Sequence, residues 1–136
     1  MIDATELFKI FGKHRKDAIV VAGGMAGYKR WPEYSTNHKR DAGGIIETMG
    51  AHGSAALGIA LAQPDQKVIV FDSEGSLLMN LGSLATTADQ KPENLYHFLL
   101  DNGCYATTGG QPVPSANSMD YAGLAKDSGY VSVHSF

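Results

Sequence analysis

The sequence predicts an α/β domain with a doubly wound, mostly parallel sheet flanked by helices. Short runs of β-branched and apolar residues alternate with segments of helical periodicity, which is typical of strands joined by crossover helices. One of these runs, residues 67–71, carries no charge after Lys67, as expected for a strand buried on both faces. The 136 residues, 43% of them apolar, suffice for one domain and are too few for two. We therefore expect a single domain over residues 1–136.

The first third of the chain predicts a helix, a strand and a long loop. Apolar residues recur at helical spacing over residues 5–14, and Thr5 is the expected N-cap. Residues 18–22 form a β-branched run, which we interpret as the first strand. Residues 23–44 are rich in Gly, Pro, Asn and alternating charge, so we expect one loop there.

The remaining elements follow the same alternation. Helices are expected at residues 51–63, where small residues permit close packing, and at residues 76–90 with a break at Gly82. Residues 95–100 are the third strand, and a polar loop covers residues 101–118. A helix at residues 121–127 and a fourth strand at residues 130–133 complete the expected order.

Composition argues against several classes of function. The net charge of −3 provides no basic field for nucleic acid. The first residues carry acids where a signal peptide carries bases, and no apolar run approaches the ~20 residues of a membrane span. A soluble, cytoplasmic protein is expected. With Cys104 as the sole cysteine and no paired His spacing, a zinc site is not expected.

Polar residues with glycine follow the second and third predicted strands. Ligands of such sheets bind at the carboxyl ends of the strands. Glu74 precedes a predicted helix start, where a carboxylate can hold a cation and backbone N–H groups a phosphate. Asn102 offers an amide oxygen, which suits Mg²⁺ or Ca²⁺. Taken singly, each site is also typical of a helix cap or a turn.

Together, these residues resemble a known motif pair. Glu74-Gly75-Ser76 followed by Asp101-Asn102 resembles the Gly-Asp-Gly and Asn-Asn or Asp-Asn motifs of thiamine-diphosphate enzymes. Further segments look like the sulfopyruvate and phosphonopyruvate decarboxylases, and the resemblance covers roughly residues 45 to 130. These segments are Thr48-Met49-Gly50, residues 57–62, residues 76–82 and residues 108–112.

The resemblance implies the thiamine-diphosphate-binding fold, with thiamine diphosphate and Mg²⁺ as cofactors. The implied metal ligands are the Glu74 carboxylate, the Asn102 side chain and the backbone carbonyl of Cys104. Met49 matches the apolar residue that supports the bent cofactor, although a core methionine is an equal alternative. The implied cofactor-binding residues are Glu47, through its backbone, and Thr48, Met49, Gly75, Ser76, Asn102, Cys104 and Tyr105.

Two departures from the family pattern leave alternatives open. Ser73-Glu74-Gly75 replaces Gly-Asp-Gly and lengthens the metal ligand by one methylene. Either the loop accommodates Glu74, or the site binds metal weakly or not at all. Ala51-His52 stands where the similar decarboxylases carry His then Ala, so His52 either faces the site or solvates a helix end.

The resemblance also implies a partner. The glutamate that activates the cofactor belongs to a pyrimidine-binding domain, and this chain matches only the diphosphate-binding (PP) domain. We therefore expect no catalytic residue in this chain, and a hetero-oligomer with an alpha subunit that carries the other domain. The chain is similar to a beta subunit, and a full and a C-terminally shortened PP domain both stay open.

The implied reaction is decarboxylation of a small anionic 2-oxo acid, with sulfopyruvate or 3-phosphonopyruvate as candidates, to CO₂ and an aldehyde. The basic residues Lys29, Arg30, Lys39 and Arg40 are candidates for binding the second anionic group, or form a solvated loop. Two alternatives remain: an acetolactate-synthase-like carboligase subunit and a non-catalytic assembly subunit with a degenerate metal site. A dinucleotide-binding domain is disfavoured, because Gly23, Gly24 and Gly27 lack the required spacing.

Overall fold

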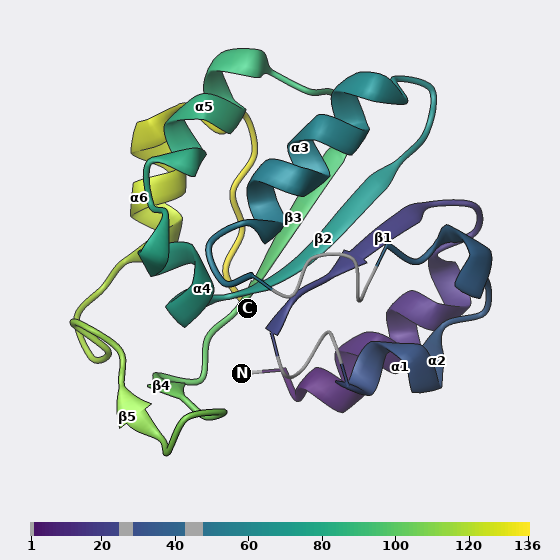
Figure 1. Ribbon diagram of the computed structural model, residues 1–136. Coiled ribbons are helices and arrows are strands. Elements are labelled where there is room, and N and C mark those ends of the chain that lie inside the picture. Colours follow the sequence, from purple (N-terminus) through teal and green to yellow (C-terminus); the bar gives the residue numbers. More distant parts are fainter. Residues whose placement is uncertain (1, 25–28, 43–47) are drawn as a thin grey trace.

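The computed structural model describes residues 2–24, 29–42 and 48–136. Its centre is a three-stranded parallel sheet in the order β1 (Ile19–Ala22), β2 (Val68–Ser73) and β3 (Leu95–Leu100) (Figure 1). Ile19 pairs with Val68, and Val68 with Leu95, so the three strands start level with one another. All carboxyl ends therefore meet at one edge of the sheet, as the alternation of the sequence predicts.

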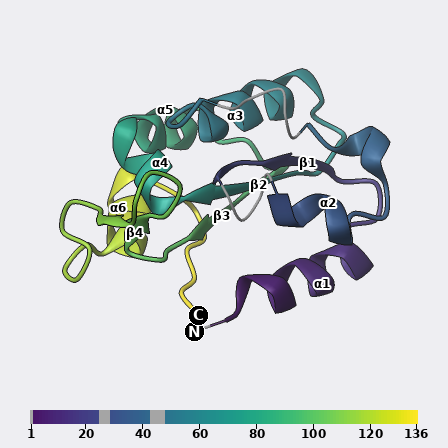
Figure 2. The ribbon, with the colours of Figure 1, turned by 60° about the horizontal axis from the view of Figure 1, so that its bottom comes forward.

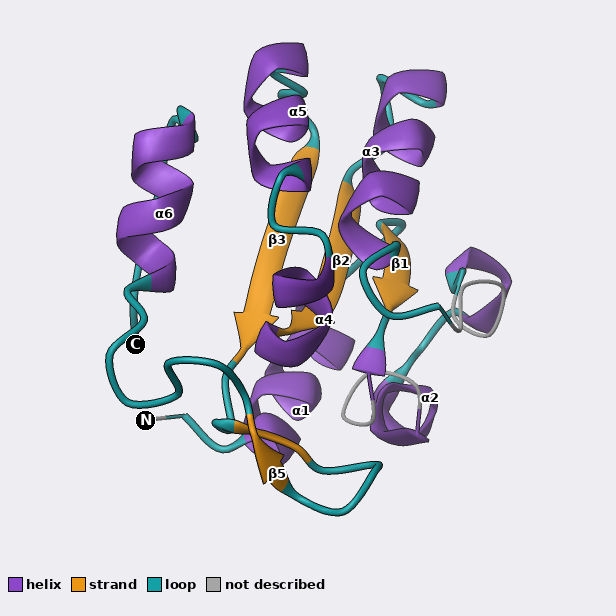
Figure 3. Cartoon of the chain, turned by 60° about the vertical axis from the view of Figure 1, so that its left-hand side comes forward, coloured by secondary structure: helices purple, strands orange, loops and turns teal. Residues whose placement is uncertain are grey.

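Helices cover both faces of this sheet. Figure 2 shows α1 (Ala4–His14) and α2 (Trp31–Tyr34) on one face, with α3 (His52–Ala62) and α5 (Ser83–Gln90) on the other. The short helix α4 (Glu74–Met79) follows β2 directly, and α6 (Tyr121–Ser128) stands beside α5 (Figure 3). The described residues thus confirm a doubly wound parallel sheet.

The two faces have different cores. Beneath α1, Phe71 of β2 is fully buried among aromatic rings, with its centroid 5.0 Å from that of Phe8 and 5.2 Å from that of Phe11. Beneath α3, Ala56 and Ala60 pack on the valines of β1 and β2. The small residues of α3 allow this close approach, as expected from their abundance in the sequence.

Element boundaries differ from the predictions at two helices. Thr5 is not the N-cap of α1; the side chain of Asp3 is, because it accepts from the backbone N–H groups of Thr5 (2.8 Å) and Glu6 (3.3 Å). The predicted helix at residues 76–90 is two helices, α4 and α5, separated at residues 80–82. The break expected at Gly82 is therefore confirmed.

The predicted fourth strand at residues 130–133 is wrong. Gly129, at φ 105°, ends α6, and the tail then runs back beside β3 (Figure 1). Within the described residues this tail joins no sheet, and Val131 is 97% exposed. β-branched residues favour a strand only when a neighbouring strand pairs with them, and among the described residues none pairs with this tail. The Tyr130 hydroxyl lies 3.5 Å from His97 Nδ1 of β3.

The segment predicted as one long loop, residues 23–44, contains structure. Besides α2 it holds the 3-10 helix η2 (His38–Arg40) and an isolated parallel bridge between Asp41 and Val20 of β1. The predicted polar loop at 101–118 likewise contains a two-stranded antiparallel hairpin of β4 (Cys104–Tyr105) and β5 (Gln111–Pro112). Among the described residues, no helix is long and apolar enough to cross a membrane.

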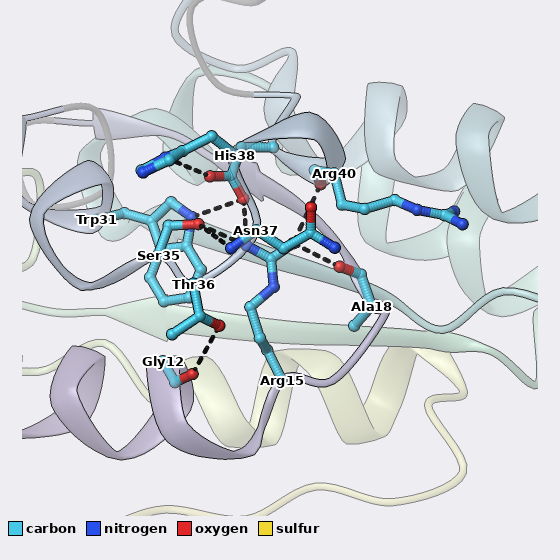
Figure 4. A network of polar contacts seen from close by, with 10 residues as sticks. Gly12, Arg15, Ala18, Trp31, Ser35, Thr36, Asn37, His38 and Arg40 are labelled. Atoms are coloured by element: carbon cyan, nitrogen blue, oxygen red, sulfur yellow. Dashed lines mark hydrogen bonds and ion pairs between the residues drawn. The ribbon is translucent and has the colours of Figure 1, made fainter.

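A buried arginine fastens the segment between α2 and Asp41 to the domain (Figure 4). The Arg15 guanidinium donates to Ser35 Oγ at 2.7 Å, to the carbonyl of Ala18 at 2.6 Å, and to the Asp41 carboxylate. Trp31 Nε1 donates to the same carboxylate at 3.1 Å. Ser35 and Asp41 lie 20 and 26 positions from Arg15 in the sequence, so helical periodicity around Arg15 gave no indication of these two partners.

Replacing Arg15 with Met should lower the free energy of unfolding by about 3 kcal/mol, because it leaves the Asp41 carboxylate without its buried partner. Urea denaturation followed by far-ultraviolet circular dichroism measures this loss. Lys13→Met is the control, since Lys13 is exposed in the last turn of the same helix. Equal losses in the two variants would contradict the anchoring role of Arg15.

Candidate functional site

Three residues predicted to bind a metal meet at the carboxyl edge of the sheet. Glu74 is the first residue of α4, directly after β2. Asn102 and Cys104 follow β3, and Ser73 at the end of β2 pairs with Leu100 at the end of β3. The parallel register therefore brings together residues that are 28 to 30 positions apart in the sequence.

The Cys104 backbone N–H lies at the centre of this group. It donates to Glu74 Oε1 at 3.1 Å and to Asn102 Oδ1 at 2.9 Å. Gly103, at φ 75°, makes the sharp turn that presents it, and the Asp101 side chain accepts from the Gly103 N–H at 3.0 Å. The Glu74 carboxylate and the Asn102 amide oxygen consequently both lie against the Cys104 N–H.

Glu74 is 1% exposed, and its second oxygen, Oε2, has no hydrogen-bond partner. Burial raises the pKa of the Glu74 carboxyl. A buried carboxylate oxygen without a donor is costly, and a cation is the group that satisfies it. The predicted ligands are carboxylate, amide and carbonyl oxygens, which suit a hard divalent cation. Of these, Glu74 Oε1 and Asn102 Oδ1 accept from the Cys104 N–H, and the Cys104 carbonyl accepts from the Ala106 N–H at 3.1 Å. The residues present thus fit Mg²⁺.

The charge of the site favours an anionic co-ligand. Of the three predicted ligands, Glu74 is charged, whereas the Asn102 amide and the Cys104 carbonyl are neutral, so a divalent cation held by these three retains positive charge. A phosphate or diphosphate complements that charge and also coordinates Mg²⁺ through oxygen.

Gly75 and Tyr105, both predicted to contact the cofactor, are in contact with each other. A Cβ on Gly75 would lie 2.6 Å from Tyr105 Cε1, so no side chain fits there. The β4–β5 hairpin holds Tyr105 by pairing it with Gln111. The glycine of the motif is therefore required by the packing of Tyr105.

Thr48 and Met49 lie on a turn that leads into α3. The Ala51 N–H donates to the Thr48 carbonyl at 3.2 Å, and Gly50 has φ 83°, a conformation that favours glycine. Thr48 is exposed and Met49 half-buried. Glu47 lies outside the described residues, so its predicted backbone contact stays a prediction.

Ser76 is fully buried and bonded within the protein. Its Oγ accepts from the Gly50 N–H at 3.0 Å and lies 2.9 Å from His52 Nδ1. Its own N–H donates to Ser73 Oγ at 3.3 Å. In this structure both polar groups of Ser76 are thus engaged, and a diphosphate contact by Ser76 remains a prediction.

Sequence reasoning missed a buried network behind the site. Asp72 is 2% exposed, and its Oδ1 lies 3.0 Å from His52 Nδ1 and its Oδ2 3.7 Å from His97 Nε2. His52 therefore does not solvate a helix end; it is buried against Gly23, where a Cβ would lie 2.4 Å from its ring. The signal was an acid directly after an apolar run, but the predicted strand ended at Phe71, whereas β2 continues to Ser73.

This network determines the charge state of Asp72. Burial alone would raise the pKa of the Asp72 carboxyl, but the hydrogen bond with His52 and the nearby His97 and Ser76 side chains outweigh it and hold that pKa well below its ordinary value. Asp72 is therefore an anion in the interior, surrounded by donors.

Comparison with known proteins gives a consistent result. The sequence pattern of a family described as "Thiamine pyrophosphate enzyme, C-terminal TPP binding domain" matches residues 22–134. The chain is 46% identical over 86 residues to the sulfopyruvate decarboxylase subunit beta of Methanothermobacter thermautotrophicus, covering 63% of this chain and 45% of that one. It is 49% identical over 90 residues to the phosphonopyruvate decarboxylase of Streptomyces hygroscopicus, covering 66% and 22%. The chain thus spans less than half the length of either relative.

The fold has a counterpart among solved structures. A candidate thiamin diphosphate-dependent enzyme from Mycobacterium smegmatis superposes with a TM-score of 0.75, covering 94% of this chain and 25% of that one. The sequences are 20% identical, so this likeness concerns the fold alone.

Replacing Asp72 with Asn should lower the free energy of unfolding at pH 7 by about 2 kcal/mol, because charge-assisted hydrogen bonds are lost. The folded-state pKa of Asp72 lies below the ordinary 3.8, so its contribution is present above that pH and is lost as the pH falls further. Urea denaturation between pH 7 and pH 2 should therefore show a constant difference between the wild type and the variant above pH 3.8, and a difference that narrows as the pH falls below it. The control is Asp65→Asn, at an exposed position, and a pH-independent difference would count against an ionised Asp72.

Proposed function

The chain belongs to the thiamine pyrophosphate enzyme family, in its C-terminal TPP-binding domain, and on that premise we propose that it binds the diphosphate end of thiamine diphosphate together with Mg²⁺. The observation that carries this proposal is the buried, unpartnered Oε2 of Glu74 beside Asn102 Oδ1. Glu74, Asn102 and the Cys104 carbonyl would hold the metal, with Gly75 and Tyr105 beside it. Residues 1–136 then form one PP-type domain.

The residues of this chain bind and orient the cofactor in this proposal. When bound, thiamine diphosphate supplies the nucleophile and the electron sink for decarboxylation. Met49, half-buried on its turn, supports the thiamine part, while the Glu47 backbone and Thr48 lie next to it in the sequence. The burial of Glu74 keeps water from its carboxylate, which strengthens its attraction for a cation.

We propose a 2-oxo acid with a second anionic group as the substrate, decarboxylated to CO₂ and an aldehyde. The support is the names of the relatives, which act on sulfopyruvate and phosphonopyruvate. Of the four basic candidates, Arg40 lies away from the predicted metal ligands. Arg40 Nη1 donates to Gln66 Oε1 at 3.1 Å, which places Arg40 near the amino end of β2, whereas Glu74 follows its carboxyl end.

We further propose that the chain is the beta subunit of a split enzyme. Its alpha subunit would carry the pyrimidine-binding domain and the activating glutamate, and the active site would form between the two. Support comes from relatives named subunit beta and from exposed residues beside the site, Thr48, Met79 and Asn102.

The direct test is purification of the chain from its native source, followed by assays of the complex with each 2-oxo acid. An equimolar partner and aldehyde release support the proposal. Formation of a 2-hydroxy ketone instead would show a carboligase, the activity named for relatives at 34% and 31% identity. Absence of calorimetric heat with thiamine diphosphate and Mg²⁺ would indicate an assembly subunit.

Replacing Glu74 with Gln should weaken Mg²⁺-dependent binding of thiamine diphosphate by at least about tenfold, since the charged metal ligand is lost. Isothermal titration calorimetry of the complex at varied Mg²⁺ measures this effect. Glu74→Asp, which restores the family residue, should bind at least as tightly as the wild type. Glu93→Gln is the control at an exposed carboxylate; equal affinity of the Glu74→Gln variant and this control would refute the metal role.

A further inference from the structure

We propose that His52 is a positioning residue that acts through the Ser76 hydroxyl to hold the Thr48–Ala51 turn, and with it Met49, in place. This inference rests on the proposed function, because Met49 is the residue expected to support the bent cofactor. It concerns a buried histidine that the proposed cofactor contacts do not include.

The contact runs from His52 to the backbone of the turn. His52 Nδ1 lies 2.9 Å from Ser76 Oγ, and that oxygen accepts from the Gly50 N–H at 3.0 Å. On its other side, the Gly50 carbonyl accepts from Asn80 Nδ2 at 3.1 Å. Ser76, within α4, therefore holds the Gly50 N–H, and Asn80, just after α4, holds the Gly50 carbonyl. Met49 is the immediate neighbour of Gly50 in the sequence.

His52 is itself held in one orientation. Asp72 Oδ1, 3.0 Å from Nδ1, is an acceptor because the carboxyl is ionised, so Nδ1 carries a proton. The ring is 2% exposed and fills the space beside Gly23, where a Cβ would lie within 2.4 to 2.6 Å of ring atoms. The Nδ1 proton lies between Asp72 Oδ1 and Ser76 Oγ, so the packed imidazole sets the position of the serine hydroxyl next to it.

The geometry favours positioning over the other roles of histidine. A general acid or base must reach the substrate, whereas His52 is buried behind Ser76. A metal ligand needs converging donors, and the described part of the chain contains no such cluster of three or more His, Cys, Asp or Glu side chains. We assign the positioning role to the contact between His52 and Ser76, which is the described contact that links His52 to the turn.

If His52 holds the turn, its loss should affect the binding of thiamine diphosphate more than the binding of inorganic diphosphate. The turn carries Met49, which faces the thiamine part, whereas the diphosphate end lies with Glu74 and Asn102. Loosening the turn therefore weakens thiamine diphosphate binding and leaves inorganic diphosphate binding unchanged. A general loss of structure would weaken both to the same extent, so the ratio of the two affinities separates the two explanations.

The test compares His52→Leu, His52→Asn and Ser76→Ala with the wild type, each as the full chain in complex with its partner. Titration calorimetry with saturating Mg²⁺ measures the Kd of thiamine diphosphate and of inorganic diphosphate. His52→Leu should weaken thiamine diphosphate binding roughly tenfold, the equivalent of one buried hydrogen bond, and change diphosphate binding by less than about twofold. Ser76→Ala should weaken thiamine diphosphate binding as well, but because Ser76 is itself a predicted diphosphate contact, the ratio of the two affinities is taken from His52→Leu. His52→Asn, which keeps a donor near Nδ1, should retain most of the affinity. His14→Leu is the matched control at an exposed histidine.

Amide hydrogen exchange of the ligand-free protein supplies a readout without cofactor. The Gly50 amide should exchange faster in His52→Leu and in Ser76→Ala than in the wild type. Equal weakening of both ligands, or unchanged Gly50 exchange with unchanged affinity, would overturn the role of His52. A wild type that binds no thiamine diphosphate would refute the proposed function, while the Gly50 exchange rates would still decide whether His52 holds the turn.

Discussion

The buried Asp72 carboxylate is the group on which the site end of the fold depends. It lies on β2, and its two oxygens face His52 of α3 and His97 of β3. An anion in the interior is tolerated only where donors surround it, so α3 and β3 must both approach β2 closely at this point. Ala56 and Ala60 allow α3 to come that near. The same contact thereby sets where α3 begins and where the turn before it lies.

A second polar network serves the opposite end of the sheet. Arg15 bonds to the carbonyl of Ala18, just before β1, and to Asp41, which bridges to Val20. The two networks thus fasten the segments before and after β1 to a sheet whose strands are held by apolar packing. Each network includes a side-chain contact between residues 20 positions apart in the sequence. Each depends on which side chains are present rather than on the secondary structure around them.

The site itself combines one buried carboxylate with oxygen donors on a tightly turned loop. Glu74 is one methylene longer than the aspartate of the related motif, and it reaches the Cys104 N–H at 3.1 Å. The turn through Asp101 and Gly103 presents that N–H to Asn102 as well. The longer side chain is therefore accommodated without separating the predicted ligands, and Glu74 Oε2 is left in need of a cation.

The sequence by itself determined the fold class and the position of Glu74 and Asn102 just after predicted strands, because hydrophobic periodicity and turn residues act over a few positions. The wider set of cofactor-binding residues is what the family resemblance implies, and it stays a prediction. The N-cap at Asp3, the helix within residues 31–34 and the absence of a strand at 130–133 depended on contacts that periodicity does not encode. Only the tertiary structure decided that His52 is buried on Asp72 and Ser76, because the partners of a buried polar group are chosen by the packing of distant elements.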